Sequence, residues 1–109
     1  MSTTAKPRVR VPKSVKRGEA FEIRTLITHP MESGQRKDDS GKTIPRKILN
    51  KFVCTLDGEM VFTAELAPAV AANPYLAFFC RAEKSGTLRF AWTDDDGTVI
   101  VEEAAVNVA

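Results

Sequence analysis

The chain has 109 residues and a formal net charge of +2, and 43% of its residues are hydrophobic. This length predicts one domain over residues 1–109, with a hydrophobic core that needs no metal or disulfide to hold it. The composition excludes a disordered chain, and no apolar run approaches the roughly 20 residues of a membrane-spanning helix.

Charge is distributed unevenly along the chain. Residues 1–51 carry 13 Lys and Arg against 5 Asp and Glu, whereas residues 52–109 carry 3 against 9. This pattern predicts either a surface that steers a charged partner or charge that is merely solvated. Residues 1–10 are polar and basic with no apolar segment behind them, so they do not form a secretory signal. We expect residues 1–7 to be a flexible tail.

Short alternating segments rich in Val, Ile, Thr and aromatic residues recur between turn signals. They predict strands over residues 8–11, 20–28, 47–56, 59–66, 75–82, 87–93 and 98–108. Asp57-Gly58 indicates a hairpin turn, residues 67–74 predict a crossover with one helical turn, and a bulge is expected near Glu102. The fold class that follows is all-β, an antiparallel immunoglobulin-like β-sandwich of about seven strands, with a small barrel as the alternative.

The alternation also predicts which side chains face the core. Leu26 and Phe79 break the apolar face and are expected to point outward, with Tyr75 a further exposed apolar contact. The side chains expected to face inward are Phe21, Ile23, Ile27, Phe52, Cys54, Leu56, Met60, Phe62, Ala64, Leu66, Leu76, Phe78, Cys80, Leu88, Phe90 and Trp92.

Residues 29–45 stand apart, with two glycines, two prolines and no apolar period. Loops of this length within a compact domain are uncommon and often functional. Residues 38–41 are expected to form a hairpin tip within this loop. The sequence therefore favours an interaction module over an enzyme.

No catalytic, metal or cofactor set is evident. The chain has a single histidine, His29, and two cysteines, Cys54 and Cys80, without the spacing of a zinc or CxxC site. The cysteines are expected to be buried thiols or to form a disulfide, and a reactive thiol is the third alternative. Nucleic-acid binding is not expected, because the basic half lacks interleaved exposed aromatics.

Several segments resemble the SoxZ family, the Z subunits of the bacterial thiosulfate-oxidation carrier complex. They are Thr-Leu-Ile-Thr-His-Pro-Met-Glu-Ser-Gly at 25–34, Arg-Lys-Asp at 36–38, Ile-Pro-Arg at 44–46, Ala-Asn-Pro-Tyr-Leu-Ala-Phe at 72–78 and the run from Gly86 to Gly97. The resemblance extends from about residue 20 to the C-terminus, and the His-Pro-Met-Glu-Ser-Gly stretch is its most specific part.

The resemblance implies a non-catalytic subunit without a cofactor that pairs with a SoxY-type subunit. In that family the SoxY cysteine arm carries sulfur intermediates, and sulfur-oxidising enzymes act on it transiently. The segment 102–109 has no glycine or cysteine, which fits the Z partner. A periplasmic home is implied through co-export with a signal-bearing partner. No nucleic acid or membrane partner is expected.

Partner binding is assigned to the loop and its neighbours on the basis of length and irregularity. Basic side chains there, Lys47 included, are expected to attract anionic sulfur groups or acidic enzymes. The candidate contacts are Leu26, His29, Pro30, Met31, Glu32, Ser33, Gly34, Arg36, Lys37 and Arg46. The alternatives are a stand-alone ligand-binding sandwich and a small thiol-dependent redox protein that uses Cys54 or Cys80 with His29.

Overall fold

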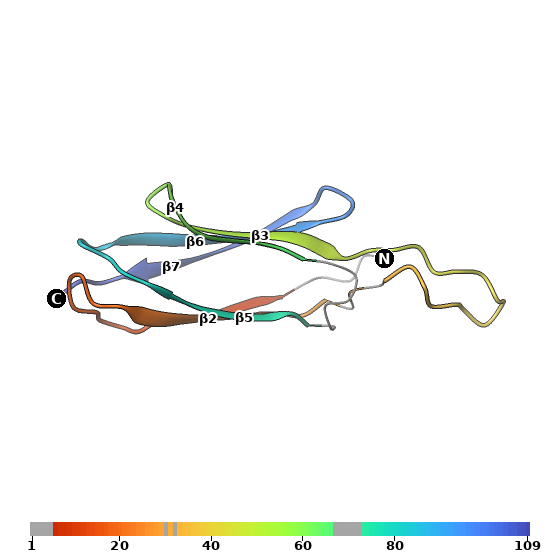
Figure 1. Cartoon of the computed structure of the whole chain (residues 1–109), viewed down its shortest axis with the longest axis horizontal. Helices are drawn as coiled ribbons and strands as arrows, with labels where there is room; N and C mark the ends of the chain where they lie inside the picture. The colour runs from red at the N-terminus through yellow and green to blue at the C-terminus, as the bar shows by residue number, and fades with distance from the viewer. Residues whose placement is uncertain (1–5, 30, 32, 67–72) are drawn as a thin grey trace.

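A computed structural model describes residues 6–29, 31, 33–66 and 73–109. Within them seven antiparallel strands form two packed sheets, which confirms the predicted immunoglobulin-like sandwich (Figure 1). The strands are β1 (Pro7–Arg10), β2 (Phe21–Ile27), β3 (Leu49–Leu56), β4 (Glu59–Glu65), β5 (Tyr75–Cys80), β6 (Gly86–Asp94) and β7 (Val99–Val106).

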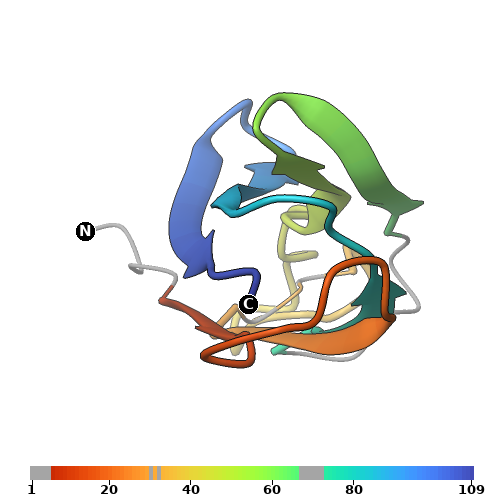
Figure 2. The same cartoon turned by 90° about the vertical axis from the view of Figure 1, so that its left-hand side faces the viewer.

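The strand order is β1-β2-β5 in one sheet and β4-β3-β6-β7 in the other. Figure 2 shows the two sheets facing each other, and the buried hydrophobic side chains of the core lie between them. β1 already begins at Pro7, inside the range assigned to an N-terminal tail, whereas residues 1–5 lie outside the described part of the chain. Within that part, no helix has the length and hydropathy to cross a membrane.

Aromatic side chains from both sheets meet at the centre of the sandwich. Phe52 and Trp92 are fully buried, with ring centroids 5.1 Å apart. Phe62 of β4 stacks on Phe78 of β5 at 4.5 Å, which joins the two sheets across the core. These contacts follow from the alternation of β3, β5 and β6, whose inward positions were predicted from the period of two.

Two sequence expectations about strand faces are wrong. Met60 is 62% exposed, because the β3–β4 pairing shifts register between Cys54 and Thr55 and turns Met60 to the outer face. The bulge expected near Glu102 is absent: β6 and β7 pair in continuous register along their length. β7 is an outermost strand, and Glu102 is half-buried on it. The expected helical turn falls mostly on 67–72, outside the described residues.

The loop between β2 and β3 contains a small hairpin that projects from one end of the sandwich (Figure 1). Lys37 and Thr43 form an isolated bridge, and the Asp38 carboxylate accepts hydrogen bonds from the amides of Ser40 and Lys42 at 2.9 and 3.0 Å. This confirms the predicted tip at 38–41. The molecule is elongated, at 58 × 23 × 20 Å.

Candidate functional site

His29 is the centre of a buried network at the end of β2. Its Nε2 lies 2.8 Å from Oδ2 of Asp94, the last residue of β6, and both side chains are 6% exposed. The amide of Met31 donates to His29 Nδ1 at 2.9 Å. Since Nδ1 accepts a hydrogen bond, the ring proton is on Nε2 and is donated to the Asp94 carboxylate. Both ring nitrogens are therefore engaged within the fold, and neither is available as a base.

The backbone on either side of the imidazole is fixed by hydrogen bonds to two other segments. Asn73, just before β5, accepts from the His29 amide through Oδ1 at 2.9 Å and donates its own amide to the His29 carbonyl at 2.7 Å. The Met31 sulfur accepts from the amide of Leu49, the first residue of β3, at 3.3 Å. Met31 and Asn73 adopt positive φ angles of 52° and 54°, the local backbone strain at this junction.

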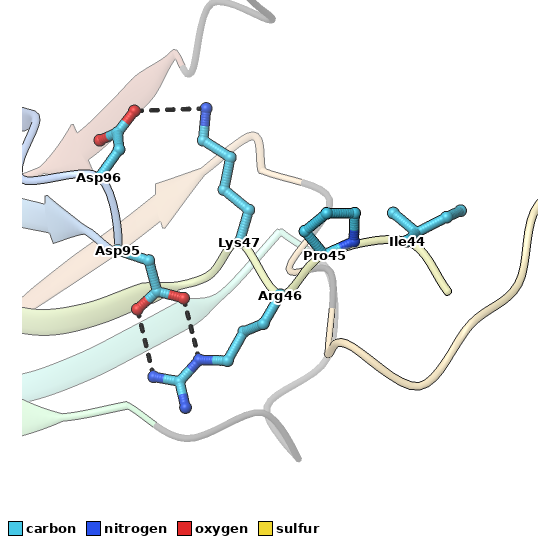
Figure 3. Close-up of a pocket in the computed structure, with 6 residues that line it drawn as sticks. All are labelled: Ile44, Pro45, Arg46, Lys47, Asp95 and Asp96. Atoms are coloured by element: carbon cyan, nitrogen blue, oxygen red, sulfur yellow. Dashed lines mark hydrogen bonds and ion pairs between the residues drawn. The ribbon is translucent and has the colours of Figure 1, made fainter. Parts of the chain in front are cut away.

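The acidic turn after β6 holds the other end of the loop. The Asp95 carboxylate accepts from Arg46 Nε and Nη2 at 2.9 and 3.1 Å, from the Ile48 amide at 3.1 Å and from Asn50 Nδ2 at 3.0 Å. The hydrogen bonds from Arg46 are the main reason why the pKa of Asp95 falls to about 2. Lys47 pairs with Asp96 at 3.4 Å (Figure 3). Asp94-Asp95-Asp96 thus anchors a loop.

An open groove of about 500 Å³ lies at this anchor, lined by Ile44, Pro45, Arg46, Lys47, Asp95 and Asp96. Figure 3 shows that the four charged side chains in it face each other in two ion pairs. A ligand would have to compete with those pairs. The groove therefore gives little support to the alternative of a stand-alone ligand-binding sandwich.

The structure separates the candidate partner contacts into four groups. His29 and Met31 are buried, Ser33 and Gly34 are partly buried, and Pro30 and Glu32 lie outside the described residues. The remaining candidates are exposed: Leu26, Arg36, Lys37 and Arg46. Gly34 touches the loop's return, because a Cβ at this position would lie 3.0 Å from Arg46 Cβ. The buried members shape the loop, and partner binding by the exposed ones stays a prediction.

Both cysteines are free and buried, which is the first of the three alternatives raised for them. Burial raises the pKa of the Cys54 thiol to about 12 and also raises the pKa of Cys80. The redox alternative required a thiol of lowered pKa beside His29, and the structure shows neither that pKa nor an available imidazole. Among the described residues, no group of three or more His, Cys, Asp or Glu is arranged to hold a metal ion.

Sequence reasoning missed the partners of His29. Asp94 was assigned to a turn, although it continues the inward parity of Leu88, Phe90 and Trp92. An acidic residue on the core side of a strand needs a buried partner, and the lone histidine was the obvious one. Asn73 gave no comparable signal.

Comparison with known proteins gives one family and several structures. The family model described as "Sulphur oxidation protein SoxZ" matches residues 9–105. A superoxide reductase (neelaredoxin) from Ignicoccus hospitalis superposes with a TM-score of 0.72 at 18% identity, over 94% of this chain and 80% of that chain. For a putative superoxide reductase from Thermotoga maritima the values are 0.65, 15%, 94% and 85%. At these identities the likeness concerns the fold alone. No curated protein matches the chain.

Proposed function

The chain belongs to the SoxZ family, and on that premise we propose that it is the non-catalytic subunit of a sulfur carrier heterodimer in thiosulfate oxidation. Its partner is a SoxY-type subunit whose C-terminal cysteine arm carries the covalent sulfur intermediates. The sulfur-oxidising enzymes of the pathway visit that arm in turn. The observation that carries the proposal is the family match over residues 9–105, nearly the whole chain.

The chemistry of this chain's own side chains supports a non-catalytic role. A thiol must be deprotonated and accessible to accept sulfur, and Cys54 is fully buried with a pKa of about 12. The imidazole that would activate a thiol is hydrogen bonded at both nitrogens. The reacting sulfur atom then resides on the partner, and this chain contributes shape and charge.

The projecting hairpin is the part of the loop suited to meeting visiting enzymes. Arg36, Lys37 and Lys42 are exposed on it, and they outnumber Asp38 and Asp39. Arg46 and Lys47 at its base are paired with Asp95 and Asp96. A net positive charge on the hairpin raises the encounter rate with acidic enzymes and anionic sulfur groups. The location that suits this role is the periplasm, reached by co-export with the signal-bearing partner.

The heterodimer is tested by affinity purification of the chain with the SoxY-type subunit, followed by intact-mass analysis. We expect a stoichiometric complex in which the partner, and not this chain, gains mass from bound sulfur after incubation with thiosulfate and the pathway enzymes. Turnover of thiosulfate by the purified chain alone would contradict the proposal.

The steering role of the hairpin is tested by charge reversal. Arg36→Glu with Lys37→Glu should slow association with the pathway enzymes severalfold at low salt and flatten its salt dependence. Lys84→Glu is the matched control, since Lys84 is exposed in the β5–β6 turn at the opposite end of the sandwich. Equal association rates for both variants would remove the steering role.

A further inference from the structure

The outer face of the β1-β2-β5 sheet carries an exposed apolar stripe. Leu26 lies directly opposite Tyr75 in the β2–β5 register, and Ala77 and Phe79 follow on the same face of β5. Leu26, Tyr75 and Phe79 are 38%, 57% and 68% exposed. We call these four residues the β5 stripe.

β5 is an outermost strand of its sheet within the described residues. Soluble proteins usually protect such strands with charge, and they rarely expose several neighbouring large apolar side chains. Aromatic side chains are also the residues that most often dominate binding energy at protein interfaces. The β5 stripe therefore has the composition of an interface and not that of an ordinary solvated sheet face.

Arginines border the stripe on the side of β1. Arg8 lies opposite Leu26, and Arg10 lies opposite Arg24, so all three guanidinium groups project from the same face as the stripe. Glu22 is the only carboxylate in these rows, and it pairs with Arg24 Nε at 2.9 Å. The face is thus apolar along β5 and positively charged beside it.

The outer face of the other sheet lacks this arrangement. Its exposed large apolar side chains are Met60 on β4 and Val99 and Val101 on β7, the two opposite edges of that sheet. Arg89 of β6 is opposite Glu103 of β7 on the same face, so this face carries charges of both signs. Small, separated groups of apolar residues of this kind need no partner.

We propose that the outer face of the β1-β2-β5 sheet is the surface on which the second subunit of the carrier docks. The partner presents an apolar patch to Leu26, Tyr75 and Phe79 and aspartate or glutamate side chains to the arginines. This inference rests on the proposed function for the identity of the partner. A second copy of this chain would join two faces of equal net positive charge, which disfavours a homodimer here.

The stripe is tested by truncating its aromatic side chains and measuring the dissociation constant of each variant with the purified SoxY-type subunit. Phe79→Ala and Tyr75→Ala should each raise the dissociation constant about tenfold to thirtyfold. Met60→Ala is the control, because Met60 is equally exposed but lies on the other sheet, and its dissociation constant should stay within about twofold.

The arginine border is tested by Arg8→Glu and Arg10→Glu. Each should lower the association rate and weaken its dependence on salt, whereas Arg89→Glu on the other sheet should leave both within about twofold. An unchanged association rate in the β1 variants would show that the partner's facing surface is not acidic.

A photo-crosslinker gives a readout that does not depend on stability. With p-benzoyl-phenylalanine in place of Phe79, illumination of the complex should link the two subunits, and the same group in place of Met60 should not. If wild-type chain binds the SoxY-type subunit but the stripe variants bind equally well, the docking surface is wrong and the proposed function stands. If wild-type chain does not bind the SoxY-type subunit, both the proposed function and the docking surface fail. If residue 79 crosslinks to a second copy of this chain, only the docking surface fails.

Discussion

The imidazole of His29 donates to Asp94 and accepts from Met31, so its loss would take the hydrogen-bond partner from Asp94 Oδ2 and from the Met31 amide inside the protein. A buried carboxylate without its donor costs more free energy than a lost hydrogen bond between neutral groups. His29 therefore stabilises the fold by linking the end of β2 to the end of β6.

We expect His29→Ala to lower the free energy of unfolding by about 3 kcal/mol, measured by urea denaturation. Thr28→Ala, which changes the exposed neighbouring side chain, should stay within about 0.5 kcal/mol of wild type. At temperatures where the variant remains folded, binding to the partner subunit should persist. A stable His29→Ala chain that loses binding would instead make His29 a contact residue.

The thiols make a pH-dependent prediction. A pKa of about 12 for Cys54 leaves about one molecule in ten thousand as thiolate at pH 8. Only the thiolate reacts with alkylating reagents, so the reactivity of Cys54 should be low. Its labelling by iodoacetamide should be slow in the native chain and should keep rising with pH beyond about 10, where an ordinary cysteine with a pKa of about 8.5 has levelled off. In urea both Cys54 and Cys80 should label at the ordinary rate. Fast native labelling at pH 7 would contradict the buried, protonated state.

At the scale of single elements, the loop closes on itself where Gly34 meets Arg46. A Cβ at Gly34 would lie 3.0 Å from Arg46 Cβ, and φ at this glycine is +88°. Gly41 at the hairpin tip has a similar φ of +81° but no atom within 4 Å of such a Cβ. The two glycines therefore separate backbone strain from steric contact.

Gly41→Ala should cost about 1 kcal/mol of unfolding free energy through the positive φ alone. Gly34→Ala should cost about 2 to 3 kcal/mol, since the added methyl also displaces Arg46 from its place beside Asp95. Thermal or urea unfolding of the two variants measures the difference. Equal losses would mean that the 3.0 Å contact relaxes freely.

The strands show which buried positions can be predicted from the alternation of apolar and polar residues and which cannot. Inward positions of β2, β5 and β6 follow from alternation alone, and Ile23, Phe78 and Phe90 are buried as expected. Met60 fails because a register shift is a property of two paired strands, which one strand's pattern does not contain. The Asp94 partner of His29 lies 65 positions away, so only the fold brings it near.

The hairpin contributes length to the whole molecule and little to its core. The radius of gyration of the whole molecule is 16.1 Å, whereas a compact domain of this size has about 13 Å. The amide of Ile44 donates a hydrogen bond to the carbonyl of Arg36 at the base of the hairpin. All of residues 35–43 are exposed. Their side chains therefore add no apolar burial to the sandwich.

Replacing residues 37–43 with two glycines should leave the free energy of unfolding within about 1 kcal/mol of wild type. Association with the pathway enzymes should stay within about twofold of wild type, because Lys37 and Lys42 leave together with Asp38 and Asp39 and the net charge does not change. A variant with Gly and Ser at 38–42 keeps the loop length but loses two aspartates and one lysine, so its association should not be slowed. Loss of folding in the shortened chain would show that the hairpin supports the core.

The architecture of the whole chain was predictable, and so was the long irregular loop with its hairpin tip, because alternation and turn residues are local signals. Which outer face meets a partner was not, since Leu26, Tyr75 and Phe79 belong to strands that lie far apart in the sequence. The arginines of β1 join them only once β2 lies between β1 and β5.

The two free thiols bear on the conditions under which the chain can fold. The sandwich is closed by packing alone, with Cys54 and Cys80 protonated inside it, so its native state does not wait for an oxidant. Glutathione and thioredoxin keep thiols in this same form. The chain therefore needs no oxidising compartment to reach this fold.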